Sequence, residues 1–402
     1  MKMKKMLSLA AMFAVLSYAS PASAELKISG DAATRVRGQF NNSDIGGVKT
    51  KNSDDIKYQY RVRLKTAADL GDGYFFKALI ANEETTNGGT PGWSTVGATN
   101  TEKFQLEVSN FYFGRTLEKC HYQIGRLPLN SFNNPIFDLT LYPVPTDFTN
   151  AGVYAVDVPV FQWNFDRVYG MNYGTKVGNG DLNGTLVILD NNSTTENTAT
   201  TGDGLFNDGY LLHLSYKTTI GDVTVEPQAL ITLTDAQGAT YQKISPNSFG
   251  ANATIPAGKS KIGLSGFYTV CKDSKGSRFV TTPYPGDNTS TPVVETSYSL
   301  TVPTATNVDY RGYLLRAKAE SGPVMGWVDY NRTVDKSQAK EYTYNNIFVW
   351  AQYKVNVHES ALGSVSLTPT VRYRASGKET AGTDGTERNN QLRTELWASV
   401  TF

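Results

Sequence analysis

Six basic side chains near the N-terminal end of the chain are spaced by multiples of two residues in two short runs. They are Arg35 and Arg37 in the first run, and Lys57, Arg61, Arg63 and Lys65 in the second. Successive residues of a β-strand point to opposite faces, so this spacing places the cations of each run on one side of a strand. A row of cations that faces carboxylates across a narrow space creates a transverse electric field, which orients dipolar solutes and biases the passage of ions. The chemistry predicted for these residues is therefore electrostatic.

Carboxylates that could face this basic row lie in the stretch 128–159. We expect Asp138 or Asp147 on the acidic side. The stretch also contains many apolar side chains, namely Phe132, Phe137, Leu141, Tyr142, Phe148 and Tyr154. A loop that packs against an inner wall would bury such side chains, whereas a loop in water gains nothing from them. The stretch 128–159 could instead form an extracellular flap or a further pair of strands. The charged residues could instead form a salt-bridge network with a purely structural role.

No pattern of residues indicates catalysis or metal binding. The three histidines, His121, His213 and His358, do not have the spacing of metal ligands. The sequence has no Gly-x-Ser-x-Gly motif, no phosphate-binding P-loop and no Cys/His metal spacing. We therefore expect no enzyme activity, no catalytic residues, no metal site and no cofactor.

The strongest structural signal is the alternation of polar and apolar residues. Between 57 and 65 every odd position is polar and mostly cationic, and every even position is apolar or aromatic. The segments 347–355 and 365–374 alternate in the same way. A helix would instead place residues three and four apart on one face. We predict about 16 strands between residues 25 and 402.

The predicted connections alternate between tight turns and long polar stretches. Tight turns are expected at Gly71-Asp72-Gly73 and at Gly178-Asn179-Gly180, among others. The long stretches are 41–54, 82–101, 128–159, 191–208, 235–246, 272–306, 335–340 and 377–388. Short turns on one rim and long loops on the other are typical of outer-membrane barrels, and a soluble β-sandwich has no reason to sort its loops in this way. The predicted fold class is an all-β, transmembrane antiparallel β-barrel over residues 25–402.

The first 24 residues are predicted to be a cleaved export signal. Lys2, Lys4 and Lys5 precede an apolar run, and Ala22-Ser23-Ala24 provides small residues for cleavage. The apolar run is about 15 residues long, which is short for a transmembrane helix of about 20. A retained membrane anchor is the alternative.

After residue 24, no apolar stretch is long enough to cross a membrane as a helix. A membrane location then requires a closed barrel, because only that arrangement satisfies every backbone group in lipid. A charge on the lipid face at mid-bilayer costs roughly 2–4 kcal/mol, so the basic face must be the wet one. Its outward neighbours would be Val36, Tyr58, Tyr60, Val62 and Leu64. Without the signal, 35 basic residues remain against 37 acidic ones, a balance that does not indicate a nucleic-acid partner.

The export signal, the alternating strands, the sorted loop lengths and the terminal Phe402 together resemble the general bacterial porins. The resemblance implies an outer-membrane location of the Gram-negative type, surrounding lipid and a homotrimer. It also implies a water-filled channel for the passive diffusion of ions and small hydrophilic solutes. In those porins the third long loop folds into the barrel and narrows it, and here that loop would be 128–159, after Gly125-Arg126. The resemblance thus implies that the six cations and the two aspartates named above line the pore.

Two other functions fit parts of the sequence. A substrate-specific outer-membrane channel would show a track of aromatic or arginine side chains along its lumen, and Arg61 with Arg63 is too little to establish one. A secreted soluble β-protein or adhesin would lack a continuous apolar band on its outer strand faces. A substrate-specific channel would give bilayer currents that saturate with one solute. A soluble protein would dissolve without detergent.

Overall fold

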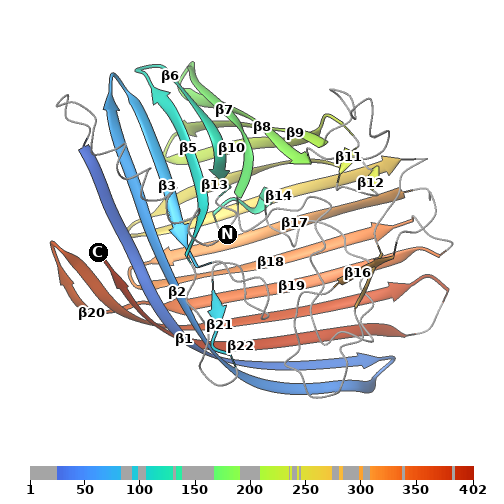
Figure 1. Cartoon of the computed structure of the whole chain (residues 1–402). Coiled ribbons are helices and arrows are strands. Elements are labelled where there is room, and N and C mark those ends of the chain that lie inside the picture. Colours follow the sequence, from blue (N-terminus) through green and yellow to red (C-terminus); the bar gives the residue numbers. More distant parts are fainter. Residues whose placement is uncertain are drawn as a thin grey trace, which may run out of the picture.

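The computed structural model describes residues 25–82, 93–97, 106–129, 133–137, 167–190, 209–234, 236–237, 242–243, 246–273, 280–283, 298–301, 308–336, 340–382 and 385–402. Within these ranges the chain forms a closed antiparallel barrel of 16 strands (Figure 1). This result confirms the predicted fold class and strand number. The predicted export signal, residues 1–24, lies outside the described residues.

The barrel strands follow one another round the sheet in chain order. They are β1 (Glu25–Ile45), β2 (Val48–Gly71), β3 (Tyr74–Ala81), β5 (Glu107–Thr116), β6 (Cys120–Pro128), β7 (Arg167–Val177), β8 (Gly180–Asp190), β9 (Gly209–Ile220), β10 (Val223–Thr232), β13 (Asn247–Ala257), β14 (Ser260–Asp273), β17 (Val308–Ser321), β18 (Val324–Asp335), β19 (Tyr342–Tyr353), β20 (Val355–Ser360), β21 (Gly363–Thr380) and β22 (Thr386–Thr401). β19 and β20 are separated only by Lys354, and both pair with β21, so together they make one strand of the barrel.

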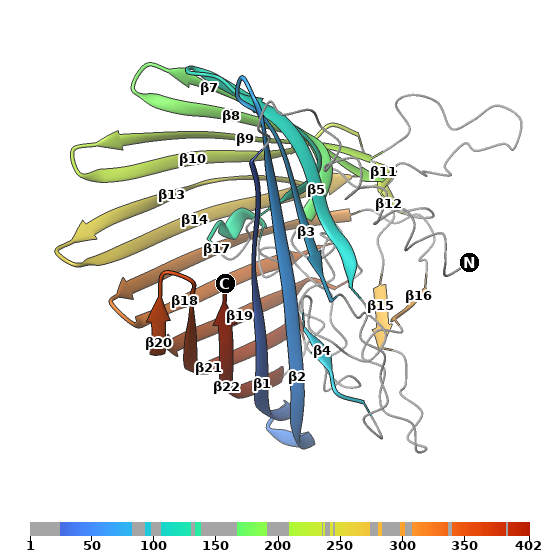
Figure 2. The same ribbon diagram turned by 60° about the vertical axis from the view of Figure 1, so that its left-hand side comes forward.

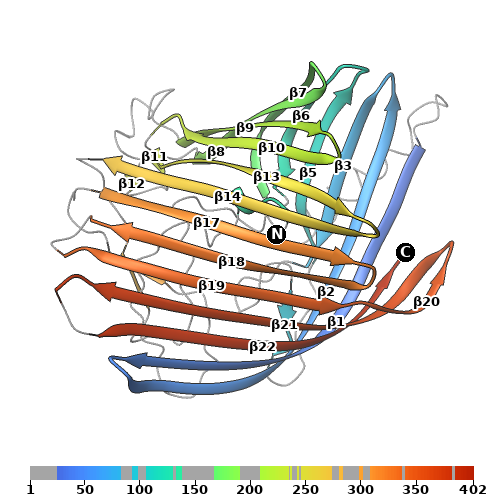
Figure 3. The same cartoon turned by 180° about the vertical axis from the view of Figure 1, so that it is seen from behind.

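The barrel closes where the first and last strands meet. β1 pairs with β2 on one side and with β22 on the other, over Asp31–Ile45 (Figure 3). At the end of this seam Gly30 and Phe402 exchange two backbone hydrogen bonds, with N···O distances of 2.8 and 3.1 Å. No edge of the main sheet is therefore left open at the junction of the two ends.

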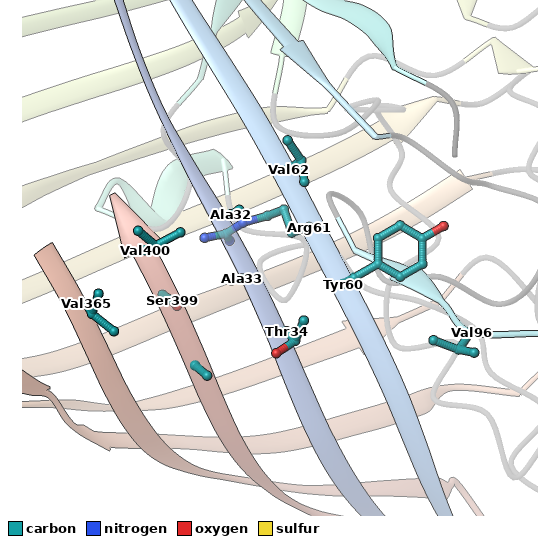
Figure 4. A pocket seen from close by; sticks show the side chains of 11 residues that line it. Ala32, Ala33, Thr34, Tyr60, Arg61, Val62, Val96, Val365, Ser399 and Val400 are labelled. Atoms are coloured by element: carbon teal, nitrogen blue, oxygen red, sulfur yellow. The ribbon is translucent and has the colours of Figure 1, made fainter. Parts of the chain in front are cut away.

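Side chains alternate between a buried polar face and an exposed apolar face. In β1, Arg35 and Arg37 are each 2% exposed, whereas Val36 between them is 43% exposed. In β2, Tyr60 and Arg61 leave the strand in opposite directions (Figure 4). Because the concave side of a closed barrel is the less accessible one, the polar residues face inward and the apolar residues outward.

The sequence-based predictions of long loops at 41–54 and 377–388 are wrong, because strands occupy most of both segments. β1 and β2 continue through the segment 41–54 and meet at a two-residue turn, Gly46-Gly47, with φ of 57° and 83°. A two-residue turn whose twist matches that of its flanking strands requires positive φ at both central residues. Glycine adopts positive φ without strain. Similarly, β21 and β22 extend into 377–388 and leave only 381–385 between them. Apart from Ile45 and Val48 beside the first turn, these strand ends are polar on both faces, so they lack the alternation that identifies a strand.

Shorter elements lie in the connections. β4 (Ser94–Thr95) pairs with β2 beyond the end of β3. β11 (Ala236–Gln237) pairs with β12 (Gln242–Lys243), and β15 (Val280–Pro283) with β16 (Tyr298–Thr301). A 3-10 turn, η1 (Pro135–Phe137), is the short teal helix inside the barrel in Figure 2. Across the described ranges, no helix combines the length and apolar character needed to span a bilayer.

Candidate functional site

The inner face of the closing seam is built around the carboxylate of Glu395 in β22. Its Oε1 accepts a hydrogen bond from Arg37 Nε at 2.7 Å, and its Oε2 lies 3.4 Å from Arg35 Nη1 and 3.1 Å from Arg372 Nη2. Trp397 Nε1 also donates to Oε2, at 2.7 Å. The Glu395 side chain is 0% exposed. Three guanidinium groups thus share one buried carboxylate.

A second carboxylate, Asp31 in β1, holds the next two arginines. Arg61 Nη2 lies 3.0 Å from Asp31 Oδ1, and Arg63 Nη2 lies 2.8 Å from Asp31 Oδ2. The register places Arg63 directly opposite Asp31 across the β1–β2 pair. The Arg61 and Arg63 side chains are 16% and 33% exposed, so both are more accessible than Arg35. In these two clusters five guanidinium groups face two carboxylates.

The remaining predicted site residues form no ion pair with these two carboxylates among the described residues, or lie outside the described ranges, although Lys57 pairs in register with Arg37. Lys57 is half-buried, with Nζ 4.0 Å from Asp55 Oδ2. Lys65 is exposed and pairs in register with Ser29, close to the turn at the end of β2. Asp138 and Asp147 lie outside the described residues. The structure therefore gathers Arg35, Arg37, Arg61 and Arg63 around carboxylates on their own wall of the barrel.

Four tryptophans continue this wall across neighbouring strands. Trp93, from the connection between β3 and β5, lies 5.2 Å from Trp397 in β22, measured between ring centroids. Trp397 meets Trp350 of β19 edge-on at 6.2 Å, and Trp350 stacks on Trp327 of β18 at 4.8 Å with an interplanar angle of 11°. The four indoles form a continuous chain of ring contacts.

Guanidinium groups lie over these rings. Arg35 and Arg61 lie 4.1 and 4.8 Å from the Trp93 centroid. Arg372 lies 3.7 Å from the Trp350 centroid, and Arg316 of β17 lies 5.2 Å from that of Trp327. These distances are within cation–π range. We call this set the Arg–Trp row; its members are Arg35, Arg61, Arg316, Arg372, Trp93, Trp327, Trp350 and Trp397.

The inner faces of β8, β9, β10, β14 and β17 are partly apolar, and residues that follow β6 cover them. Leu129, Ile136 and Phe137 belong to one buried cluster with wall residues. The wall side chains in that cluster are Val168, Val187, Leu211, Leu230, Phe267, Cys271, Tyr310 and Leu314. Ile136 is 0% exposed. The start of the stretch 128–159 therefore packs against the inside of the barrel.

Polar contacts fix η1 in this position. Asn134 and Gln228 exchange two side-chain hydrogen bonds, of 2.8 and 3.1 Å, and Asn252 Nδ2 donates to Asn134 Oδ1 at 3.1 Å. His213 shares a hydrogen bond of 2.8 Å with Gln228 Oε1, and its ring lies edge-on to Phe137 at 4.7 Å. Side chains of β9, β10 and β13 thus converge on Asn134 and Phe137.

Sequence reasoning missed several of these residues, although parity could have identified some of them. Asp31 belongs to the same odd-numbered series as Arg35 and Arg37, and Glu395 to the same series as Trp397. No sequence pattern indicates the position of Trp93. This residue lies in the connection between β3 and β5 and contacts the wall only because the barrel is closed.

Other chemistry is sparse in the part of the chain that the structure describes. No group of three or more His, Cys, Asp or Glu side chains in these ranges is placed to hold a metal ion. Cys120 and Cys271 do not form a disulfide bond, and Cys271 is buried.

The path of the backbone is similar to that of several solved structures, although the sequence identity is low. No family model matches the chain, and no curated protein matches it. Among solved structures, the outer membrane channel DcaP of Acinetobacter baumannii shares 14% identity at a TM-score of 0.49, over 95% of this chain and 99% of that chain. An anion-selective porin from Comamonas acidovorans shares 12% identity at a TM-score of 0.48, over 94% and 100% of the two chains. OmpT, an outer membrane protein of Vibrio cholerae, shares 8% identity at a TM-score of 0.47, over 92% and 97%.

Proposed function

We propose that this protein is an outer-membrane porin, whose barrel forms a water-filled channel for the passive diffusion of ions and small hydrophilic solutes. One observation carries the proposal: the barrel is closed, its outer face exposes apolar side chains, and its inner face carries buried polar and charged ones. A soluble protein would be expected to show the reverse distribution.

The energetics of the two faces support a location in a bilayer. Large apolar side chains are exposed around the outside, for example Val36 at 43%, Phe113 at 51%, Tyr173 at 54% and Leu315 at 51%. A closed sheet leaves no backbone hydrogen-bonding edge in contact with lipid. The arginines of the inner face would each cost about 2–4 kcal/mol if they faced lipid at mid-bilayer. This arrangement suits lipid outside and water inside.

The charges of the inner wall support a preference for anions. Among the described residues, the carboxylate of Glu395 forms ion pairs with Arg35, Arg37 and Arg372, and that of Asp31 with Arg61 and Arg63. An excess of fixed positive charge along a pore raises the local concentration of anions. In this proposal Lys57 and Lys65 extend the basic lining toward the two ends of β2.

We further propose that the stretch 128–159 narrows the channel. Its beginning is held against the inner wall through Asn134 and Phe137, which supports an inward course for the residues that follow. Asp138 directly follows Phe137, so it and Asp147 are the proposed acidic side of the constriction. The proposal also includes export through residues 1–24, a homotrimeric assembly and no enzymatic activity.

Liposome swelling tests the proposed function. Purified protein is reconstituted into liposomes, which are diluted into isotonic arabinose, sucrose, raffinose or stachyose. The porin account predicts swelling rates that fall steadily with the size of the sugar. Refolded protein that keeps its barrel, as judged by heat-modifiable mobility in electrophoresis, but produces no swelling would refute the function and leave the fold intact.

A further inference from the structure

We propose that three lysines near one end of the barrel, Lys27, Lys65 and Lys77, form a binding site for the phosphate group of small phosphorylated solutes. We call this set the lysine triad. The inference goes beyond the proposed function, because it assigns a preferred chemical group to one place on the inner wall. Its basis is the register of three neighbouring strands, the accessibility of the three side chains and the position of the nearest carboxylates.

The register of β1, β2 and β3 places the triad around one small side chain. Lys27 of β1 and Lys77 of β3 both lie directly opposite Ala67 of β2. Lys65 precedes Ala67 by two residues, so the two lie on the same face of β2. The three strands run side by side in Figures 1 and 2. Three lysines thus surround an alanine, whose side chain is too small to fill the space between them.

The triad lies on the inner face of the wall, close to the short turn between β2 and β3. Arg63, two residues before Lys65, binds the buried carboxylate of Asp31. The odd-numbered residues of this part of β2 therefore face inward. Residues that lie opposite each other in neighbouring strands share a face, so Lys27 and Lys77 face inward as well.

The spacing allows all three ammonium groups to contact one phosphate group. Neighbouring strands lie about 4.8 Å apart, so the Cα atoms of Lys27 and Lys77 are about 10 Å apart across Ala67. Lys65 is a diagonal neighbour of both, at about 7–8 Å. Lysine has a flexible four-carbon stem, which is long enough for the three side chains to converge above Ala67.

The three side chains are accessible to solutes. The Lys27 side chain is 69% exposed, and Lys65 and Lys77 are exposed as well. Within the described residues, neither Lys65 nor Lys77 forms an ion pair. Lys27 Nζ lies 3.2 Å from Glu25 Oε2, and the Glu25 side chain is 66% exposed. An ion pair between two such exposed groups contributes little, so a phosphate group can replace Glu25 as the partner of Lys27.

Two carboxylates border the triad on the side of the rim. Glu25 and Asp69 lie opposite each other, and Asp69 is two residues beyond Ala67. Asp69 Oδ1 accepts a hydrogen bond of 3.0 Å from the backbone N–H of Gly71. These carboxylates therefore lie beside the triad rather than within it, and the position over Ala67 is basic.

Aromatic rings hold Lys77 against the wall. Its Nζ lies 5.1 Å from the centroid of the Phe75 ring, which is within cation–π range. Tyr112 of β5 is directly opposite Lys77, and its ring meets that of Phe75 edge-on at 6.2 Å. A side chain that is already held in place loses less conformational freedom when it binds a solute. Lys77 is thus partly preorganised for binding.

These features select a phosphate monoester over a singly charged anion of the same shape. A phosphate group offers three strong acceptor oxygens, and each ammonium group has three N–H donors. At about pH 7.5 a phosphate monoester carries close to two negative charges. Methyl sulfate has the shape of methyl phosphate and a single charge. The two compounds are therefore a matched pair of probes.

The alternative is that the three lysines are only solvated charges, which add to a general attraction of the inner wall for anions. In that case the loss of any exposed lysine of the inner wall weakens the binding of anions to the same extent. The two accounts therefore differ in how the effect depends on position.

The test is calorimetric titration of the folded, full-length protein in detergent with methyl phosphate or with methyl sulfate. The proposal predicts saturable binding with a Kd about five- to thirtyfold lower for methyl phosphate, as expected when one further unit charge lies about 4 Å from one or two ammonium groups in water. Equal Kd values, or heats that do not saturate, would overturn the proposal. Because the measurement needs no current, such a result leaves the channel function intact. A barrel that binds methyl phosphate but produces no liposome swelling overturns the channel function alone.

Three variants and a control locate the site. Lys65→Met and Lys77→Met should each lower the ratio of the two Kd values about fivefold, because one ammonium group is lost while the length of the side chain is kept. Lys77→Arg, which keeps the charge, should retain most of the ratio. Lys217→Met is the control, because Lys217 is an exposed lysine of β9 that lies opposite Asp181, close to the short turn between β9 and β10.

A ratio that stays unchanged in both methionine variants, or that falls equally in Lys217→Met, overturns the assignment. Lys65 and Lys77 are both exposed, so neither replacement removes a buried contact. If one of the two variants fails to fold, the other decides.

Discussion

Arg37 and Glu395 are 358 residues apart in the chain and form an ion pair with an Nε–Oε1 distance of 2.7 Å. The contact joins β1 to β22, so it lies at the seam that closes the barrel. Arg35 and Arg372 bind the same carboxylate from either side. The residues that hold the seam together are thus also the ones that set the charge of the inner wall.

Replacing Glu395 by Gln should destabilise the barrel. The change removes the buried carboxylate that three arginines share, and the loss of one partner from a buried ion pair costs about 3–5 kcal/mol. The measurement is denaturant unfolding of the protein in lipid or detergent. The fraction of folded protein is determined from its electrophoretic mobility. Glu341→Gln is the control, since the Glu341 side chain is 43% exposed and pairs with Lys336 at 3.2 Å. Equal stability of the two variants would contradict the assigned role.

Gly30→Ala should weaken the closing seam. A Cβ at residue 30 would lie 2.6 Å from the carbonyl oxygen of Arg63 and 2.7 Å from Phe402 Cζ, so the backbone of β2 would have to move. Overpacking of this kind costs about 1–3 kcal/mol. Gly263→Ala is a matched control in β14, where the nearest atom, Lys318 Cβ, is 3.5 Å away. Thermal loss of the folded form should occur at a lower temperature in Gly30→Ala alone, and identical transitions would disprove the close approach.

Asn134→Ala should increase the conductance of the channel. Asn134 makes hydrogen bonds to Gln228 and Asn252, which hold the beginning of the stretch 128–159 against the inner wall. Without them the proposed constriction is less firmly held, and single-channel recordings should show larger or noisier steps. Asn345→Ala is the control, because Asn345 lies in β19 and accepts a hydrogen bond from Tyr330 of β18 at 3.2 Å. Unchanged steps in Asn134→Ala would argue against a constriction at this position.

Replacing both Arg61 and Arg63 by Gln should shift the channel toward cations. The double change leaves Asp31 without its two guanidinium partners and removes two positive charges from the inner wall. The reversal potential in a salt gradient reports the ratio of anion to cation permeability, which should fall severalfold. Arg332→Gln serves as the control, since Arg332 is exposed and lies between the buried residues Asn331 and Thr333 on the opposite face of β18. A reversal potential that is unchanged in the double variant would show that these arginines do not set selectivity.

Much of the fold could be predicted because burial on one side of a strand imposes a period of two. The alternation around Arg61 and Arg63 predicted a strand there, and the structure has β2 through this segment. The same reasoning failed at 41–54, where the hairpin is polar on both faces apart from Ile45 and Val48, and only Gly46-Gly47 indicates the turn. The hydrophobic pattern therefore identifies those parts of a strand that have one apolar face. It does not identify the strand ends that are polar on both faces.

The candidate site was predicted less completely. The basic residues follow from spacing alone, but their partners depend on which strands become neighbours. Glu395 meets Arg37 only because β22 closes onto β1, and Trp93 meets Arg35 only because a connection folds onto the wall. Contacts between residues so distant in the chain follow from the closed topology, which local pattern does not specify.

The central claim, that the polar face of the wall lines an aqueous channel, is tested most directly by cysteine modification during current recording. In a background with Cys120 and Cys271 changed to Ser, Arg63→Cys and Leu64→Cys are compared in a planar bilayer with a charged, membrane-impermeant thiol reagent. We predict a stepwise fall of the current for Arg63→Cys and no change for Leu64→Cys, because neighbouring residues of β2 face opposite sides. A protein that gives no current steps, or a fall for Leu64→Cys alone, would contradict the account.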